Sequence, residues 1–322
     1  MNPYLGHDHQ CSYIEEHRLV EGKGAGLRLY EVNNGKGLLM TLCPDRNMDI
    51  PRLSYRGINL NYFSPCGYVA PAFYEGTGIN WLKSFTAGFL TTCGLEQVGS
   101  PCVDEGETLP LHGSIANKPC EHSYFLEKED CIEIHSITKD ETIFGRKLAL
   151  KRKVTISKED ASFLIEDEIE NRGDATSPVE ILYHMNMGYP LLDEDSILDI
   201  PSVSVKARDA HAETGIHEWM KMQKPTPAYQ EMCYYHEFAG EEATVSLTQP
   251  KNGITLSISA NPKLLDAFVE WKMMGVRDYV LGLEFGNAYP DGRAEMRKRG
   301  ILKFLKPNEK FHYWIRVKVE QR

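Results

Sequence analysis

The feature that most constrains the fold is a series of segments in which apolar and polar residues alternate. Residues 147–156, KLALKRKVTI, place lysines and a threonine on one side of an extended chain. Successive side chains of a strand point to opposite faces, so this pattern predicts a strand with one solvated and one buried face. The residues expected on the buried face are Leu148, Leu150, Val154 and Ile156.

Further segments extend this pattern along the chain. The turn SKED, the segment SFLIEDEIEN, the connection NRGDATSP and the segment VEILYHMNMGYPLL predict an antiparallel meander. The C-terminus continues with ILKFLK, the turn PNE and KFHYWIRVKV. The apolar face of this last segment consists of Phe311, Tyr313, Ile315, Val317 and Val319.

Helical segments are few, and the best helical window is PKLLDAFVEWKMMG, residues 262–275. Alternating sheet faces must be covered by another layer, so the sequence predicts an all-β fold, a large antiparallel β-sandwich with few short helices. The clusters of methionine and aromatic residues, such as WKMMG, are interpreted as core packing. We find no long linker and no repeat of fixed period, and we expect a single domain over residues 1–322.

Composition excludes several classes of function. The chain is 42% hydrophobic and 25% charged, as in a soluble globular protein. A formal net charge of −10 disfavours nucleic acid as a partner. The N-terminus lacks a signal-peptide pattern, no window of about 18 apolar residues occurs, and eight cysteines are scattered without a C-x-x-C pair. We therefore expect a cytoplasmic protein with reduced cysteines and no membrane partner.

The segment LYHMNMGYPLL, residues 182–192, places two polar side chains in an otherwise apolar strand. His184 and Asn186 share one face, and a core is expected against the other. Buried polar groups need partners, either from the protein or from a ligand. A structural histidine that bonds to a backbone carbonyl is the alternative interpretation. The residues on the expected core face are Tyr183, Met185 and Met187.

A carboxylate stands in the middle of a second predicted strand, YVLGLEFGNAYPDGR. Glu284 lies between Gly282 and Gly286 on its own face. Flanking glycines predict free space for another molecule, and burial would raise the pKa of the carboxyl toward a value suited to proton transfer. The alternative is an exposed glutamate paired with a basic neighbour. The core face here is Leu281, Leu283 and Phe285.

Two loop segments contain further candidates. His112 lies in LPLHGSIANKPC, where a single histidine is more often structural than chemical. Arg46 lies in TLCPDRNMDI between Asp45 and Asp49, where a salt-bridged turn is the simplest interpretation.

Taken in order, PDRNMDI, FTAGFLTTCGL, LHGSIANKP, LYHMNMGYPLL and VLGLEFGN resemble the aldose 1-epimerase (galactose mutarotase-like) superfamily. The resemblance is to a branch of epimerase-like proteins without assigned sugar specificity, and it runs from about residue 20 to the end. It implies a supersandwich, which agrees with the strands inferred above. It also implies interconversion of the α and β anomers of a small-molecule sugar without a cofactor, with His184 as general acid on the ring oxygen and Glu284 as general base on the C1 hydroxyl.

The resemblance implies substrate-binding residues as well. His112 corresponds to a sugar contact near the ring, and Lys83 in WLKSF to a basic residue upstream of it. Asn186 follows His184 by two positions, whereas better-known mutarotases place an asparagine three positions after the histidine. Ser114 stands where this branch commonly has arginine, and Arg46 is the residue that could compensate.

The substrate-binding acidic residue of the superfamily has no clear match in this sequence. The segment MCYYHEF, near Glu231 and His236, is where we expect this part of the site, and His236 is the predicted sugar contact there.

Two other functions compete with the epimerase. A non-catalytic sugar-binding or sugar-sensing domain would retain His112 and an aromatic wall without needing both His184 and Glu284. The residues of that wall would be Trp81, Tyr189 and Trp271. A metal-dependent isomerase would use His112, His184, His236 and Glu284, but these residues form no compact ligand motif, so we expect no metal. Monomer and homodimer both remain open.

Overall fold

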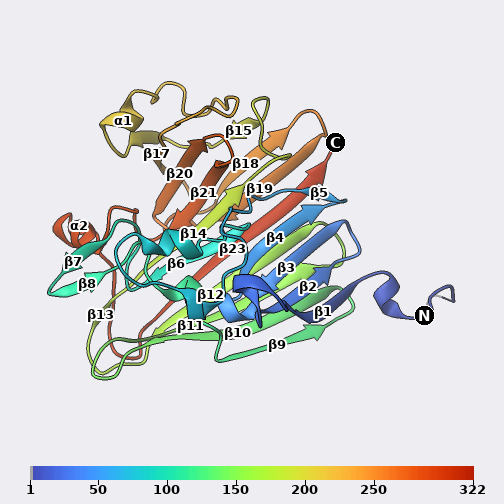
Figure 1. The fold of residues 1–322 in the computed structure, drawn as a ribbon, viewed down its shortest axis with the longest axis horizontal. Coiled ribbons are helices and arrows are strands. Elements are labelled where there is room, and N and C mark those ends of the chain that lie inside the picture. The colour runs from blue at the N-terminus through green and yellow to red at the C-terminus, as the bar shows by residue number, and fades with distance from the viewer. Residues whose placement is uncertain (1–2) are drawn as a thin grey trace.

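The strands form two large antiparallel sheets, as the computed structural model of residues 3–322 shows (Figure 1). The first sheet has eleven strands, with β5 (Ile58–Asn59) beside β4 and off the main path. The other ten strands are, in order across the sheet, β1 (Tyr13–Arg18), β2 (Arg28–Asn33), β3 (Leu38–Cys43), β4 (Asp49–Tyr55), β6 (Leu90–Leu95), β14 (Glu180–Met187), β21 (Tyr279–Gly286), β20 (Ala267–Met274), β17 (Met232–Glu237) and β16 (Ser204–Ala207).

The second sheet has eight strands, and two short pairs stand apart from both sheets. The eight strands are, in order, β15 (Ile197–Asp199), β18 (Ala243–Gln249), β19 (Ile254–Ala260), β23 (Lys310–Gln321), β12 (Ser162–Asn171), β11 (Lys147–Ser157), β10 (Cys131–Glu141) and β9 (His122–Glu127). The short pairs are β7 (Cys102–Asp104) with β8 (Glu107–Leu109), and β13 (Ser177–Pro178) with β22 (Phe304–Leu305).

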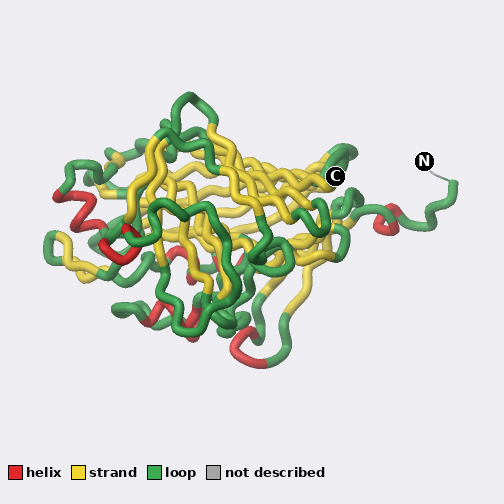
Figure 2. The backbone as a smooth tube through the Cα atoms, turned by 90° about the horizontal axis from the view of Figure 1, so that it is seen from above, coloured by secondary structure: helices red, strands yellow, loops and turns green. Residues whose placement is uncertain are grey.

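Helices are short and lie outside the sheets (Figure 2). The α-helices are α1 (Ala210–Glu213) and α2 (Arg293–Lys298). The 3₁₀ helices are η1 (Asp8–Gln10), η2 (Gly22–Gly24), η3 (Pro44–Arg46), η4 (Pro71–Phe73), η5 (Asn80–Ser84) and η6 (Ile115–Asn117). The prediction of an all-β sandwich with few short helices is confirmed. Within residues 3–322, no helix is long and apolar enough to cross a membrane.

The main core contains the apolar faces of both sheets. Each apolar set expected from the alternation of β11, β14 and β21 is buried and belongs to this one cluster. The alternation in β23 is confirmed as well, because its expected apolar face is buried or partly buried against the same cluster. Since these faces pack together, the opposite faces of β14 and β21 are available for other contacts.

A buried ion pair lies inside this core. Arg152 occupies the apolar row of β11 and donates two hydrogen bonds, of 2.9 and 2.7 Å, to the carboxylate of Asp167 on β12. It also contacts Asp49 on β4 at 3.2 Å, and the Tyr183 hydroxyl donates to Asp167 at 2.7 Å. A buried charge is tolerated only with such partners. The cluster links the second sheet to β4 and β14 of the first.

Two sequence-based predictions about the elements are wrong. The window 262–275 contains strand β20 instead of a helix, paired with β17 and β21 on its two sides. Apolar residues occupy both faces of this strand, which gave the segment the appearance of a helical pattern. The meander is also interrupted, because β10, β11 and β12 are neighbours whereas β14 joins the other sheet between β6 and β21.

Candidate active site

A cavity of about 470 Å³ lies on the face of the first sheet that carries His184 and Glu284. Strands β14, β21 and β20 contribute His184, Glu284 and Trp271 to its lining. Loop residues complete the walls, among them Trp81 from η5 and His112 from the segment after β8. Concave, largely apolar cavities with a few convergent polar groups are typical ligand sites.

His184 and Glu284 are directly opposed on neighbouring strands. The pairing of β14 with β21 places Leu182 opposite Gly286 and Asn186 opposite Gly282, so the central positions 184 and 284 face each other. His184 Nδ1 lies 3.2 Å from Glu284 Oε1. Neither atom completes a hydrogen bond of good geometry within residues 3–322, so both retain hydrogen-bonding capacity for a ligand.

Burial shifts the proton affinities of this pair in opposite directions. Desolvation, and then the neighbouring His112, lower the pKa of His184 well below 6.5, and the amide of Asn186 acts weakly the other way. Desolvation, and then the charge of Glu231, raise the pKa of Glu284 well above 4.5, while Arg208 opposes the shift. Both shifts disfavour the charged forms. Burial therefore favours a neutral imidazole and a neutral carboxyl group over the charged forms of the pair.

Backbone hydrogen bonds hold His112 in an unusual conformation. Its φ of 56° lies in the left-handed region, which is uncommon for a residue other than glycine. Its N–H donates to the carbonyl of Gly99 at 2.9 Å, and its own carbonyl accepts from the N–H of Gly94 at 3.0 Å. The N–H of Gly99 also donates to His112 Nδ1 at 3.3 Å, which assigns the imidazole proton to Nε2. Burial lowers the pKa of His112 to about 4, so the ring is neutral at neutral pH.

The residue after His112 must be glycine. Gly113 has a φ of 71°, and a Cβ atom there would collide with the carbonyl oxygen of Gly94. The LHG segment thus packs against the end of β6 so closely that no side chain fits at position 113. This close approach fixes His112 relative to His184, whose ring centroid lies 5.6 Å away.

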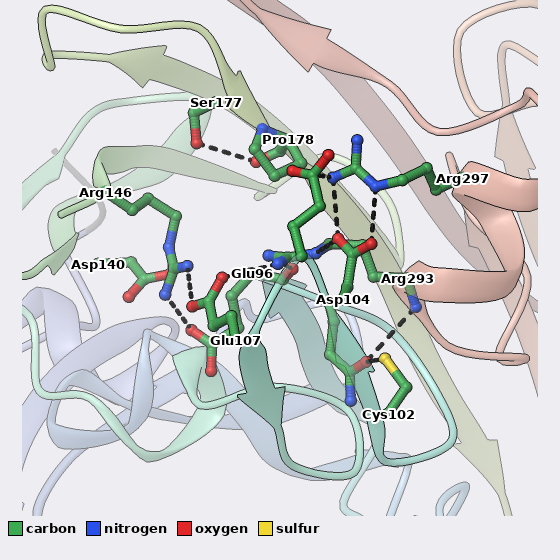
Figure 3. A network of polar contacts seen from close by, with 12 residues as sticks. Glu96, Cys102, Asp104, Glu107, Asp140, Arg146, Ser177, Pro178, Arg293 and Arg297 are labelled. Carbon is green, nitrogen blue, oxygen red and sulfur yellow. Dashed lines mark hydrogen bonds and ion pairs between the residues drawn. The ribbon is translucent and has the colours of Figure 1, made fainter.

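An ion-pair network supports the same segment from outside the cavity (Figure 3). The Ser114 hydroxyl donates to Glu96 at 2.9 Å, and Arg146 donates to Glu96 at 2.9 Å and to Glu107 at 3.0 Å. Figure 3 shows Arg297 facing Asp104, with contacts of 2.7 and 2.8 Å. Ser114 belongs to this network and does not line the cavity.

Aromatic rings surround the pair on several sides. The ring of His184 lies 5.2 Å from Phe85 and 5.1 Å from Trp271, measured between centroids. Trp81 stacks on Phe85 at 4.6 Å and contacts His112 at 4.8 Å. These rings exclude water, which accounts for the desolvation of the pair. Of the predicted aromatic wall, Trp81 and Trp271 line the cavity, whereas Tyr189 is 71% exposed and does not.

Trp271 is anchored at its polar edge. Its indole N–H donates to Glu231 at 2.7 Å, and Glu231 lies 3.6 Å from Arg208. Arg208 also contacts Asp209 at 3.5 Å, and its Nη1 donates to the sulfur of Cys233 at 3.4 Å. The two ion pairs are longer than normal hydrogen bonds, so the guanidinium retains donors that face the cavity.

Asn186 shares the face of His184 on β14 but does not line the cavity. It is fully buried, and its side-chain N–H donates to the backbone carbonyl of His184 at 2.9 Å. The side chain is therefore placed to support the His184 backbone.

The two basic residues predicted to bind sugar do not line the cavity. Arg46 is buried and donates to the carbonyls of Ala116, Val69 and Ser84 at 2.9, 3.0 and 2.8 Å. It thereby joins three loops. The predicted salt bridge of this turn is absent from the ion pairs of residues 3–322, since Asp45 binds Arg28 at 2.8 Å.

Lys83 points to solvent, where it pairs with Glu75 at 2.8 Å. His236 is buried on the core side of the sheet, with Nδ1 at 3.1 Å from Ser202 and Nε2 at 3.3 Å from Glu270. The structure therefore brings His184, Glu284 and His112 together and leaves Arg46, Lys83 and His236 elsewhere. Within residues 3–322 no group of three or more His, Cys, Asp or Glu side chains is placed to hold a metal ion.

The glycines beside Glu284 do not have the role predicted from the sequence. A Cβ atom on Gly282 would collide with Glu284 Oε1, so this glycine leaves room for the carboxylate itself. A Cβ atom on Gly286 would lie 2.6 Å from Leu182 and 2.7 Å from the carbonyl oxygen of Ile181. The space they provide is therefore used by the protein and not by a ligand.

Sequence reasoning missed several polar residues of the cavity. Arg208 follows β16, and nothing in its neighbourhood marks it except Asp209, which caps α1 by accepting from the N–H of Ala212. Tyr62 donates to Asp278 at 3.0 Å and joins two loops at the rim. Among these residues only Glu231 was indicated by the sequence, because the acidic residue implied by the family resemblance was expected near MCYYHEF.

A second depression, of about 600 Å³, lies on the second sheet. Its charged side chains pair with one another, for example Lys151 with Glu168 at 2.7 Å and Lys153 with Glu166 at 3.1 Å. Because these groups already have partners across the strands, the depression offers no comparable chemistry.

Comparison with known proteins gives a family match and solved structures with a similar fold. The model of a family described as a domain of unknown function, DUF4432, matches residues 24–319. Comparison with curated proteins gives no match. A solved structure from Klebsiella pneumoniae, of a protein provisionally named an aldose 1-epimerase, superposes with a TM-score of 0.88 and 25% identity, covering 95% of this chain and 83% of that one.

Two more distant structures share the fold. A galactose mutarotase-like protein from Clostridium acetobutylicum has a TM-score of 0.68 and 12% identity, over 97% of this chain and 100% of that one. A galactose 1-epimerase from Lactobacillus acidophilus has a TM-score of 0.65 and 12% identity, over 96% and 99%. The galactose mutarotase-like sandwich expected from the sequence is thereby confirmed.

Proposed function

Because the chain belongs to the DUF4432 family, whose function is unassigned, we propose its activity from the geometry of the cavity: it is an aldose 1-epimerase. The observation that carries the proposal is the opposed pair, with His184 Nδ1 3.2 Å from Glu284 Oε1 on the floor of the cavity. Anomer exchange needs one proton donor and one acceptor beside the anomeric carbon. The fold neighbours named as epimerases support the same chemistry.

The reaction requires no net change in protonation. One member of the pair protonates the ring oxygen while the other removes the proton of the C1 hydroxyl, so the C1–O5 bond breaks and an open-chain aldehyde forms. Rotation about C1–C2 exposes the other face of the carbonyl, and closure returns both protons. The enzyme ends each turnover in the state in which it began.

The distribution of the proton differs from the assignment expected from the family resemblance. That assignment makes the histidine the acid and the glutamate the base, whereas both pKa shifts favour a proton on Glu284 over a proton on His184. The two descriptions differ by the transfer of one proton across 3.2 Å, and either one provides an acid and a base.

His112 is placed to bind the sugar. With its proton assigned to Nε2, its neutral ring can donate to a ring or hydroxyl oxygen beside the pair. Trp271 and Trp81 offer flat apolar surfaces against which the C–H faces of a sugar ring can pack.

The test is exchange between α and β anomers, followed by NMR for a panel of sugars. We expect acceleration by the wild type and a loss of about 10²- to 10⁴-fold in His184→Ala and Glu284→Gln. Glu241→Gln, at a glutamate whose side chain is 83% exposed, is the matched control and retains full activity. Saturable sugar binding without acceleration of exchange would favour the sugar-binding alternative instead.

A further inference from the structure

One end of the cavity is apolar, and we call it the apolar end, formed by Leu82, Met273 and Val280. Met273 on β20 and Val280 on β21 are directly paired across the strands, on the same face as Trp271 and Glu284. Val280 is buried and Met273 half-buried, whereas Leu82 lines the cavity from η5 with 50% exposure. A ligand group at this end therefore meets hydrocarbon on the floor and on one wall.

The polar groups nearest to this end are already bonded to the protein. The Ser64 hydroxyl donates to the carbonyl of Phe85 at 2.5 Å, and Cys66 donates to the carbonyl of Leu82 at 3.2 Å. The Tyr62 hydroxyl donates to Asp278 at 3.0 Å, at the exposed rim. These bonds leave few donors for a substrate hydroxyl at the apolar end.

The side of the cavity formed by β17 and the segment after β16 has the opposite character. Arg208 retains N–H donors, because its contacts with Glu231 and Asp209 are ion pairs of 3.6 and 3.5 Å. Arg208 and Cys233 lie beside Trp271, since Cys233 is directly opposite Trp271. Sugar hydroxyls can therefore bind on this side, whereas Leu82, Met273 and Val280 offer them no side-chain hydrogen bond.

Strand geometry relates the apolar end to the acid–base pair. Glu284 Oε1 lies against Gly282, which is two residues from Val280 on β21, or roughly 7 Å along an antiparallel strand. A sugar ring whose anomeric carbon lies at the pair covers Gly282 and Trp271. The side of the ring remote from the anomeric carbon, with the substituents on C4 and C5, then points to Met273 and Val280.

We propose that the substrate is a deoxy sugar, which places a methyl or methylene group against Leu82, Met273 and Val280 where a common sugar has a hydroxyl. This inference rests on the proposed epimerase function and names its substrate class. A hydroxyl buried against these side chains loses its bonds to water without replacement, whereas a methyl group gains apolar contact. A hydrophobic pocket of this kind discriminates by roughly 10- to 100-fold in kcat/KM.

The experiment compares matched pairs of sugars that differ in one hydroxyl. Anomer exchange is measured for D-galactose and D-fucose, D-glucose and 6-deoxy-D-glucose, and L-mannose and L-rhamnose. We expect at least one deoxy member to exceed its hydroxylated partner by about 10-fold or more in kcat/KM. Saturation-transfer NMR of a 6-deoxy sugar should give its strongest protein signal at the methyl protons.

A polar substitution in the apolar end provides the second arm. Met273→Gln keeps the length of the side chain but offers hydrogen bonds, so it should lower the deoxy preference by about 5-fold or more. Met220→Gln, at a half-exposed methionine outside the cavity, is the matched control and leaves the preference unchanged.

The failures of the two proposals are distinguishable. Equal acceleration of both members of every pair would overturn the deoxy inference and leave the epimerase function intact. Acceleration of no sugar at all would overturn both.

Discussion

Gly282 and Glu284 share one face of β21, and the absence of a side chain at Gly282 creates the space that the Glu284 carboxylate occupies. The glycine is two positions from the carboxylate along the strand and opposite Asn186 on β14. The position of Glu284 Oε1 beside His184 therefore depends on the absence of a Cβ atom at Gly282.

Gly282→Ala should displace the Glu284 carboxylate while the strand remains paired. Misplacement of a reacting group by about 1 Å lowers rates by roughly 10²-fold, so we expect a loss of this size in kcat. The measurement is anomer exchange at saturating sugar, with thermal unfolding as the test of folding. Gly145→Ala, where a new Cβ would meet Thr142 at 3.4 Å, is the control. Unchanged exchange in Gly282→Ala would contradict the placement of Glu284 in the reaction.

The pH dependence of exchange should show a broad plateau. The pair is active while it holds one proton, so activity declines only when His184 gains a second proton or Glu284 loses its proton. The pKa of His184 lies well below 6.5, so the acid limb of the profile lies below that pH. The pKa of Glu284 lies well above 4.5, so the basic limb lies at a higher pH than an ordinary glutamate would give. We expect kcat/KM to show no acid limb centred on pH 6.5, the usual pKa of a free imidazole. A decline centred on pH 6.5 would show that a histidine titrates normally in the free enzyme.

Arg208 and Lys83 should differ in their effect on sugar binding. Arg208 lines the cavity, whereas Lys83 points to solvent. A hydrogen bond from a charged group contributes about 1.5 to 3 kcal/mol, so Arg208→Met should raise KM by roughly 10-fold or more. Lys83→Met removes only an exposed ion pair and should leave KM within about twofold. Steady-state exchange kinetics test this, and the reverse ranking would restore Lys83 as the sugar ligand.

Arg46 should matter for stability and not for sugar recognition. Its guanidinium donates to three carbonyls from separate loops and is buried. Arg46→Met leaves those carbonyls without their donor, so we expect the free energy of unfolding to fall by about 3 kcal/mol. Urea unfolding measures the change. Arg56→Met, at an exposed arginine bonded to Gln321 at 2.9 Å, is the control. A stable Arg46→Met variant with a raised KM would contradict this account.

The local part of the site could be predicted from the sequence because side chains in a strand repeat every two residues. That period alone placed His184 with Asn186 and separated Glu284 from its core neighbours. Burial of the carboxyl and the rise in its pKa were expected from the glycines on either side of it, although Gly282 leaves room for the carboxylate itself. The two-residue period did not identify β20 as a strand, because its apolar residues face the core on one side of the sheet and the cavity on the other.

What the sequence by itself determined was the class of fold and the faces of its strands, since these depend on patterns within about ten residues. The tertiary structure decided the rest. Register between β14 and β21 brought His184 opposite Glu284, loop packing directed Arg208 into the cavity and Lys83 away from it, and Gly282 opened space for a carboxylate instead of a ligand. These outcomes depend on contacts between segments far apart in the chain, and the pattern within one segment contains no information about its distant partner.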